Sequence, residues 1–149
     1  MASTTTDRRQ GLNAGAAVKV PVRAATTANI TLAAEQTIDG VALVTNDRAL
    51  VKDQTTASQN GIYRVATGNW TRDYDFDGTF DVVEGTFVHV NQGTTNGESM
   101  WRVATSGTIV PGTTSLSFER ALVSDSSSIS FTASGSGAVS ISVQNALRV

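Results

Sequence analysis

Turn-forming dipeptides recur at short intervals along the chain, and this spacing constrains the fold more than any other feature of the sequence. They are Asp39-Gly40, Asn60-Gly61, Gly68-Asn69, Asp77-Gly78, Asn96-Gly97 and Pro111-Gly112. Asn-Gly and Asp-Gly supply the positive φ that tight hairpin turns require. The runs between them are rich in Thr, Val and aromatic residues, which favour strands. The sequence therefore predicts an all-β fold, a small antiparallel β-sandwich or barrel of hairpins.

The apolar runs between the turns mark the expected strands. We expect strands at 49–52, 61–66, 86–91, 99–104 and 116–120. Residues 28–36 are the one stretch that resembles a helix, and this stretch is short.

Residues 51–68 and 90–107 form an internal near-repeat. Each begins with a strand, continues through a Gln/Thr-rich turn and ends in a strand of the pattern aromatic-Arg-Val-Ala-Thr. Because side chains alternate along a strand, we expect Tyr63 and Trp101, each with the Val two residues later, to face the core. The intervening arginines then point away. The repeat predicts two related hairpins in one sheet or barrel.

Three zones differ in composition. Residues 1–17 are polar and without periodicity, which is typical of a flexible arm that orders only against a partner. Residues 18–123 carry the turns and strands and are expected to form a β-rich domain. Residues 124–149 begin with a Ser-rich run and predict a Ser/Gly-rich hairpin appendage.

This tail has a strand pattern of its own. Apolar residues alternate with polar ones in two runs, 129–133 and 139–143, and Gly135-Ser136-Gly137 separates them. An isolated two-stranded hairpin is marginal in water, so its apolar stripe needs a partner, which is either its own domain or the same tail of a neighbouring subunit. We favour the neighbour, because the Ser-rich run resembles a linker and identical subunits commonly associate symmetrically. The tail is therefore expected to make an oligomer or attachment contact.

Composition excludes several classes of protein. Charged residues make up 16% of the chain and the net charge is −2. The only basic pair, Arg8-Arg9, is interpreted as part of a solvated arm, so we expect no nucleic-acid partner. The absence of cysteine removes disulfides, zinc-thiolate sites and thiol catalysis. No apolar run approaches about 18 residues and the start has no apolar signal region, so we expect synthesis in the cytosol and no membrane insertion.

Residues for catalysis are scarce. The only histidine, His89, is expected on the same strand face as Phe87, as a partly buried strand or interface residue. No nucleophile elbow, phosphate-binding loop or His-containing metal motif occurs. Carboxylates that converge in space would still permit glycoside hydrolysis, but no spacing indicates it. We expect no enzymatic activity, no cofactor and no metal.

One acidic segment does match a metal-binding pattern. Asp73, Asp75, Asp77 and Glu84, with Gly78 at the sixth position, fit the twelve-residue calcium loop. The flanking sequences predict turns and strands rather than the helices of an EF-hand. The alternative is a β-turn at Asp77-Gly78 with solvated carboxylates and Arg72 as counter-charge, and we favour this alternative.

Four aromatic residues are candidates for stacking on sugars. They are Tyr63, Trp70, Tyr74 and Trp101. In a chain with few aromatic residues such side chains more often belong to the core. An exposed Trp70 or Tyr74 beside Asp75 and Asp77 would favour sugar binding.

A series of segments resembles a known module. The segments are VRAATTANITL (22–32), QTIDGV (36–41), DRALVKDQTTASQNGIY (47–63), WTR (70–72), DFD (75–77) and EGTFVHVNQGTTN (84–96). Residues 18–121 thereby resemble a β-rich module of bacteriophage virion proteins, common in tail fibres, tail tips and related surface appendages. The resemblance implies an architectural role, often trimeric, and supplies no catalytic residues. It also implies that the acidic residues after WTR belong to the module's ordinary pattern.

The resemblance leads to three expectations for function. The first is a tail-fibre, tail-tip or baseplate protein of the virion. This protein is expected to assemble in the host cytoplasm as a homo-oligomer, with a trimer favoured, and to contact other virion proteins. The second is a capsid-decorating or head-fibre protein, which the small size and neutral, hydroxyl-rich surface favour. The third is a carbohydrate-binding module that attaches to a host-surface glycan.

Overall fold

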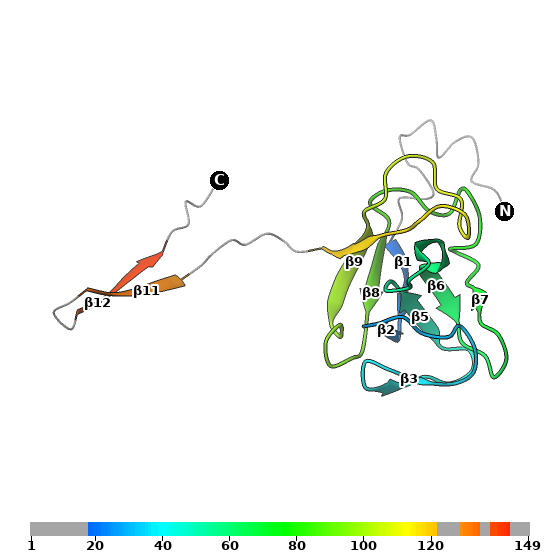
Figure 1. The fold of residues 1–149 in the computed structure, drawn as a ribbon, viewed down its shortest axis with the longest axis horizontal. Coiled ribbons are helices and arrows are strands. Elements are labelled where there is room, and N and C mark those ends of the chain that lie inside the picture. Colours follow the sequence, from blue (N-terminus) through cyan, green and yellow to red (C-terminus); the bar gives the residue numbers. More distant parts are fainter. Residues whose placement is uncertain (1–17, 122–128, 135–137, 144–149) are drawn as a thin grey trace.

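The computed structural model describes residues 18–121, 129–134 and 138–143, and this part of the chain is all-β, as the sequence predicts (Figure 1). The only helical element among these residues is the 3₁₀ turn η2 (Ala57–Gln59). The strands are β1 (Val18–Val22), β2 (Ala24–Ala25), β3 (Thr37–Ile38), β4 (Val41–Ala42), β5 (Arg48–Val51), β6 (Gly61–Arg64), β7 (Thr71–Arg72), β8 (Phe87–Val90), β9 (Ser99–Val103), β10 (Phe118–Arg120), β11 (Ile129–Ser134) and β12 (Ala138–Val143).

Residues 18–121 form two four-stranded sheets with the same pattern of connections. We call them sheet A, in the order β1-β8-β9-β10, and sheet B, in the order β2-β5-β6-β7. In each sheet the first pair is parallel and the other two pairs are antiparallel. The sheets are therefore mixed, and neither closes into a barrel.

The internal repeat occupies equivalent places in the two sheets. Its first copy forms the hairpin β5–β6 in sheet B, and its second forms β8–β9 in sheet A. The expectation that both hairpins share one sheet is therefore wrong. The reason is that β1 and β2 follow each other in the chain but pair with different hairpins. Arg23 lies between them, donates its amide to Arg48 O (2.8 Å) and accepts the amide of Gln92 (2.9 Å), so it ties the two hairpins together.

Two hydrophobic cores flank sheet B. The first contains residues of both sheets: Val22, Ala25, Leu50, Ile62, Phe76, Val82, Val88, Val90, Val103, Ile109 and Leu116. The second lies between sheet B and the segment that carries β3 and β4: Ala24, Ile38, Leu43, Ala49, Val51, Tyr63, Val65 and Trp70. Sheet B is therefore covered on both faces.

The predicted alternation is confirmed in both hairpins. Tyr63 and Val65 are buried in the second core, and Val103 is buried in the first core. Trp101 is partly buried and packs against the first core. Burying this apolar area stabilises the fold by roughly 25 cal/mol per Å². The five predicted strands occur as β5, β6, β8, β9 and β10, and residues 28–36 form no helix.

The turn predictions succeed where the loop is short. Asp39 and Gly40 have φ of 50° and 79° and join β3 to β4. Asn60-Gly61 and Asn96-Gly97 are not tight hairpin turns, because both hairpins have longer loops that contain a buried asparagine. The Asn60 side chain accepts the amide of Gln54 (3.0 Å) and donates to Leu116 O (2.7 Å), so it holds the loop from inside.

The tail forms the predicted hairpin. β11 and β12 are antiparallel, and the register pairs Ile129 with Val143, Phe131 with Ile141 and Ala133 with Val139. The predicted arm at 1–17 and the Ser-rich run at 124–128 lie outside the described residues.

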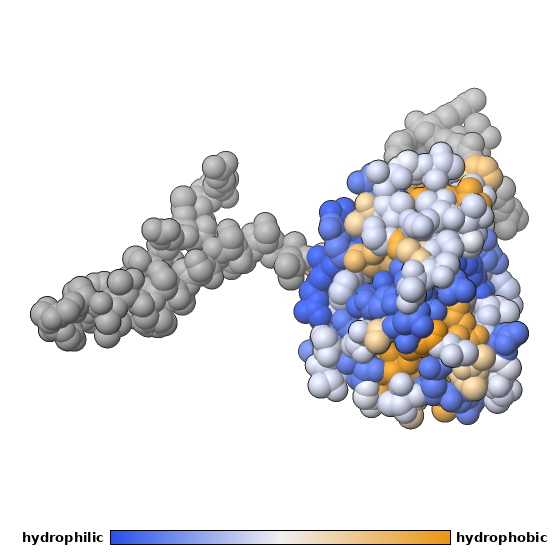
Figure 2. Space-filling view, viewed as in Figure 1, coloured by the Kyte–Doolittle hydropathy of each residue, from blue (hydrophilic) through white to orange (hydrophobic). Residues whose placement is uncertain are grey.

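One face of the two-sheet domain is mainly polar. Figure 2 shows blue and white residues over most of this face and an apolar area towards its lower end.

Candidate functional site

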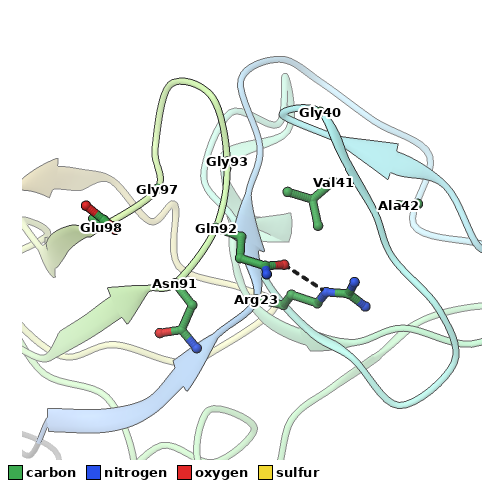
Figure 3. Close-up of a pocket in the computed structure, with 9 residues that line it drawn as sticks. All are labelled: Arg23, Gly40, Val41, Ala42, Asn91, Gln92, Gly93, Gly97 and Glu98. Atoms are coloured by element: carbon green, nitrogen blue, oxygen red, sulfur yellow. Dashed lines mark hydrogen bonds between the residues drawn. The ribbon is translucent and has the colours of Figure 1, made fainter.

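An open cleft of about 600 Å³ lies between the β3–β4 hairpin and the loop that joins β8 to β9 (Figure 3). Its lining residues come from three separate segments: Arg23, Gly40, Val41, Ala42, Asn91, Gln92, Gly93, Gly97 and Glu98. The volume falls in the range of about 300–1,000 Å³ that small-molecule sites occupy. The cleft is therefore large enough to hold a ligand of one or two rings.

Arg23 and Gln92 lie together in the floor of the cleft. In Figure 3 the Gln92 side chain points towards Arg23, and Arg23 Nε donates to Gln92 Oε1 (3.1 Å). The Arg23 Nη1 also donates to Asp47 Oδ2 (2.6 Å). The carboxylate of Asp47 therefore balances the guanidinium charge.

Asp39 fixes the loop that forms one wall. Its carboxylate accepts the amides of Thr95 (2.9 Å) and Asn96 (2.7 Å), and its carbonyl accepts the amide of Thr94 (3.0 Å). Burial raises the pKa of Asp39, but the amides of Asn96 and Thr95 outweigh it, and the pKa lies below its usual value. Ionised Asp39 therefore clamps the loop to the β3–β4 turn.

Two glycines let the loop pack this closely. A Cβ at Gly93 would collide with the Asp39 carboxylate, and one at Gly97 would collide with Gly93 O. The next residue, Glu98, has a φ of 55° although it carries a side chain. Such a left-handed residue costs of order 1–3 kcal/mol and persists only where its surroundings enforce it. The loop is thus held in one conformation.

A second polar cluster surrounds Asp73, which is 2% exposed. The β5–β6 register places Arg48 directly opposite Arg64, a like-charge pair that is destabilising by itself. Asp73 follows β7 and lies between them, paired with Arg48 and with Arg64 Nη2 (3.0 Å). Arg48 also pairs with Asp75 (3.0 Å) and donates to Val20 O (3.0 Å). Two cations and two anions therefore balance in this cluster.

Hydrogen bonds and neighbouring charges within the cluster keep the carboxylate of Asp73 ionised. Burial raises the pKa of Asp73, but hydrogen bonds from Arg64 and the Tyr74 amide and the charge of Arg48 outweigh it, so the pKa lies below its ordinary value. Burial lowers the pKa of the nearby Lys19 ammonium, which Asp75 and Asp81 partly offset. The cluster connects β1, β5, β6 and the acidic loop as a structural network.

The acidic loop does not have calcium-site geometry. Asp73 and Asp75, its first two positions, pair with arginines, while Glu84 is exposed. In the part of the chain that the structure describes, no three His, Asp or Glu side chains are placed to hold a metal ion. Arg72 is not the counter-charge, because it donates instead to the carbonyls of Ser58 (2.7 Å) and Asn60 (2.9 Å).

A turn does occur at the predicted place in this loop. The Gly78 amide donates to Asp81 Oδ2 (2.7 Å), and Phe76 and Val82 on either side are buried in the first core. Burial, together with a hydrogen bond to Asp81 and its charge, raises the pKa of the exposed Asp77. These two apolar anchors hold the folded-back loop against the domain.

The aromatic residues are mostly unavailable for stacking. Trp70 and Tyr63 are each 6% exposed in the second core. The ring of Trp101 contacts two cations, the ammonium of Lys52 (4.4 Å from the ring centroid) and the guanidinium of Arg120 (5.5 Å). Tyr74 is 82% exposed, so it alone of the four presents most of its surface.

His89 lies on the partly exposed face of β8 together with Phe87, as predicted. Its Nδ1 is 3.0 Å from Asn91 Oδ1. Its neighbour Asn91 lines the cleft.

The cleft is the feature that sequence reasoning missed. Its residues come from three distant segments and form no motif. The only local signals are the Asp39-Gly40 turn and the closely spaced Gly93 and Gly97, each of which marks a close approach of backbone.

Comparison with known proteins adds no relative: no family model, curated protein or solved structure matches this chain. Among the described residues no helix has the length and apolar character that a bilayer crossing requires.

Proposed function

We propose that this chain is a non-catalytic structural component of a bacteriophage particle, and within the particle a tail-fibre, tail-tip or baseplate protein. One observation carries the proposal. The segments that resemble the virion module supply the framework of the domain: residues 22–32 and 47–63 contain β2, β5 and most of β6, and residues 84–96 contain β8.

The polar residues of these segments support an architectural role. Arg48 is committed to Asp73 and Asp75, and the buried Asn60 and Asn96 are hydrogen-bonded to backbone carbonyls. Side chains that are hydrogen-bonded or ion-paired inside the domain are not free to contact a substrate. For an architectural role, these internal contacts are sufficient.

The edge strand β1 supports association with neighbours. It pairs with β8 on one side only, and its Val18 and Val20 are 64% and 61% exposed. Exposed apolar residues on a sheet edge are typical of surfaces that another chain covers. We propose a homo-oligomer, with a trimer following from the resemblance, that docks on other virion proteins.

Particle composition tests the proposal. Quantitative mass spectrometry of gradient-purified particles should find this chain at low copy number relative to the major capsid protein. A copy number close to that of the capsid protein would favour the capsid-decorating alternative. Recovery of the chain only in the particle-free lysate would refute a structural role in the virion.

A further inference from the structure

We propose that the cleft between the β3–β4 hairpin and the β8–β9 loop binds a neutral saccharide. The proposal goes beyond an architectural role and does not depend on where in a particle the chain is located. It also places sugar binding away from the aromatic residues that the sequence marks as candidates.

The charges around the cleft favour a neutral ligand. Arg23 is the only cation among the lining residues, and Asp47 already neutralises it at 2.6 Å. Glu98, at the rim, forms no ion pair with the described part of the chain, and ionised Asp39 supports the wall from behind. An anionic ligand would therefore find no net positive charge in the cleft. A ligand with neutral hydroxyl groups would not be repelled by the carboxylates.

The floor of the cleft offers both donors and acceptors. Gln92 Oε1 accepts from Arg23 Nε, so the Gln92 amide nitrogen is left with its two hydrogens for a ligand. Asn91 and Glu98, which also line the cleft, are further residues with polar side chains. Neighbouring hydroxyl groups of a sugar ring both donate and accept hydrogen bonds. They therefore match a site that contains both donors and acceptors.

An apolar wall completes the site. Val41 projects into the cleft opposite Gln92 in Figure 3, and Ala42 adjoins it. Aliphatic side chains contact the C–H face of a sugar through dispersion forces. The two glycines Gly93 and Gly97 also line the cleft, and their lack of a side chain lets the loop pack against Asp39 beside this wall.

The site is preorganised, which is the strongest reason to assign it a ligand. Asp39 clamps the loop with two hydrogen bonds to amides, and the buried Asn96 donates to Thr26 O (3.1 Å). Glu98 at the rim keeps a left-handed backbone. A rigid site avoids the ordering cost of about 0.5–1.5 kcal/mol for each side chain that binding immobilises, and local backbone strain concentrates at functional positions.

Nuclear magnetic resonance of the full ¹⁵N-labelled chain tests the proposal. The probes are the methyl glycosides and β-linked disaccharides of glucose, galactose and N-acetylglucosamine, with glucuronic and galacturonic acid as acidic counterparts. We expect at least one neutral sugar to shift the Gln92 side-chain amide and the Gly93 amide saturably.

The variant Gln92→Glu separates binding from folding. The new carboxylate still accepts from Arg23, but it loses both amide hydrogens, so affinity should fall by about tenfold. Asn69→Asp makes the same chemical change at an exposed position outside the cleft and should leave affinity unchanged. Both variants should keep the unliganded spectrum elsewhere in the domain.

Three results would overturn the proposal. They are no saturable shift at Gln92 or Gly93 with any neutral sugar, tighter binding of the uronic acids, and equal loss of affinity in the two variants. Shifts confined to Tyr74 would likewise exclude the cleft and place the binding at the exposed tyrosine.

Discussion

Replacing Asp73 by asparagine removes the shared anion between Arg48 and Arg64 and should be among the more damaging single changes. Asp73 is 2% exposed, and the side chain of Arg48 is 13% exposed. Breaking a buried ion pair from one side costs about 3–5 kcal/mol. Here Arg48 keeps Asp75, and Arg64 at 36% exposure regains water. We therefore expect a loss of about 2–3 kcal/mol of unfolding free energy at pH 7.

Urea denaturation measures this loss. With an m-value of about 1–3 kcal/mol/M, the urea concentration at the midpoint should fall by about 0.7–3 M. The folded-state pKa of Asp73 is lowered, so its contribution is complete above the unfolded pKa of about 3.9 and is lost as pH falls through the folded value. The difference between wild type and the Asp73→Asn variant should therefore shrink as the pH is lowered below about 4.

Asp75→Asn is the matched control. Asp75 is 28% exposed, and Arg48 keeps Asp73 in this variant, so the cost should be about 1 kcal/mol or less. Equal effects of the two substitutions, or a difference that grows at low pH, would refute the role given to Asp73.

Other positions test other parts of the fold. Phe76→Ala removes a fully buried ring from the first core and should cost about 3–5 kcal/mol in urea denaturation; a cost below about 1 kcal/mol would contradict the burial. Asn60→Ala leaves the Gln54 amide and Leu116 carbonyl without their partner and should cost about 1–3 kcal/mol by the same assay, whereas no change would show that the loop is held otherwise. Calcium should leave the melting temperature unchanged relative to EDTA, because Asp73 and Asp75 already pair with Arg48; a calcium-dependent rise measured by calorimetry would contradict this.

The central hairpins were predictable from the sequence because their information is local. β8 alternates buried and partly exposed residues, as a strand with one buried face requires, whereas β5 and β6 have consecutive buried residues because both faces of sheet B are covered. The placement of Tyr63 in the core and the Asp39-Gly40 turn also follow from neighbouring residues.

The parallel pairings were not predictable in the same way. β1 and β2 pair with β8 and β5, far along the chain, so no local pattern encodes them. Asn60-Gly61 has the composition of a hairpin turn, but burial of the asparagine side chain overrides this preference. In both cases tertiary contacts decide the outcome.

The two polar sites differ from their sequence interpretation for a related reason. The acidic loop matches a calcium pattern by spacing alone, while the register of β5 and β6 brings two arginines to its first carboxylate. The cleft arises only when the β3–β4 hairpin meets residues 91–98. Both the ion-pair cluster and the cleft depend on contacts between hairpins, so the sequence of one segment alone does not predict them.

Cryo-electron microscopy of purified phage particles tests the proposed structural role most directly, with particles that lack this chain as the reference. We predict density for the two mixed sheets at a set of symmetry-related positions on the tail, absent from the reference particles. Identical maps with and without the chain would contradict the proposal that it is part of the virion.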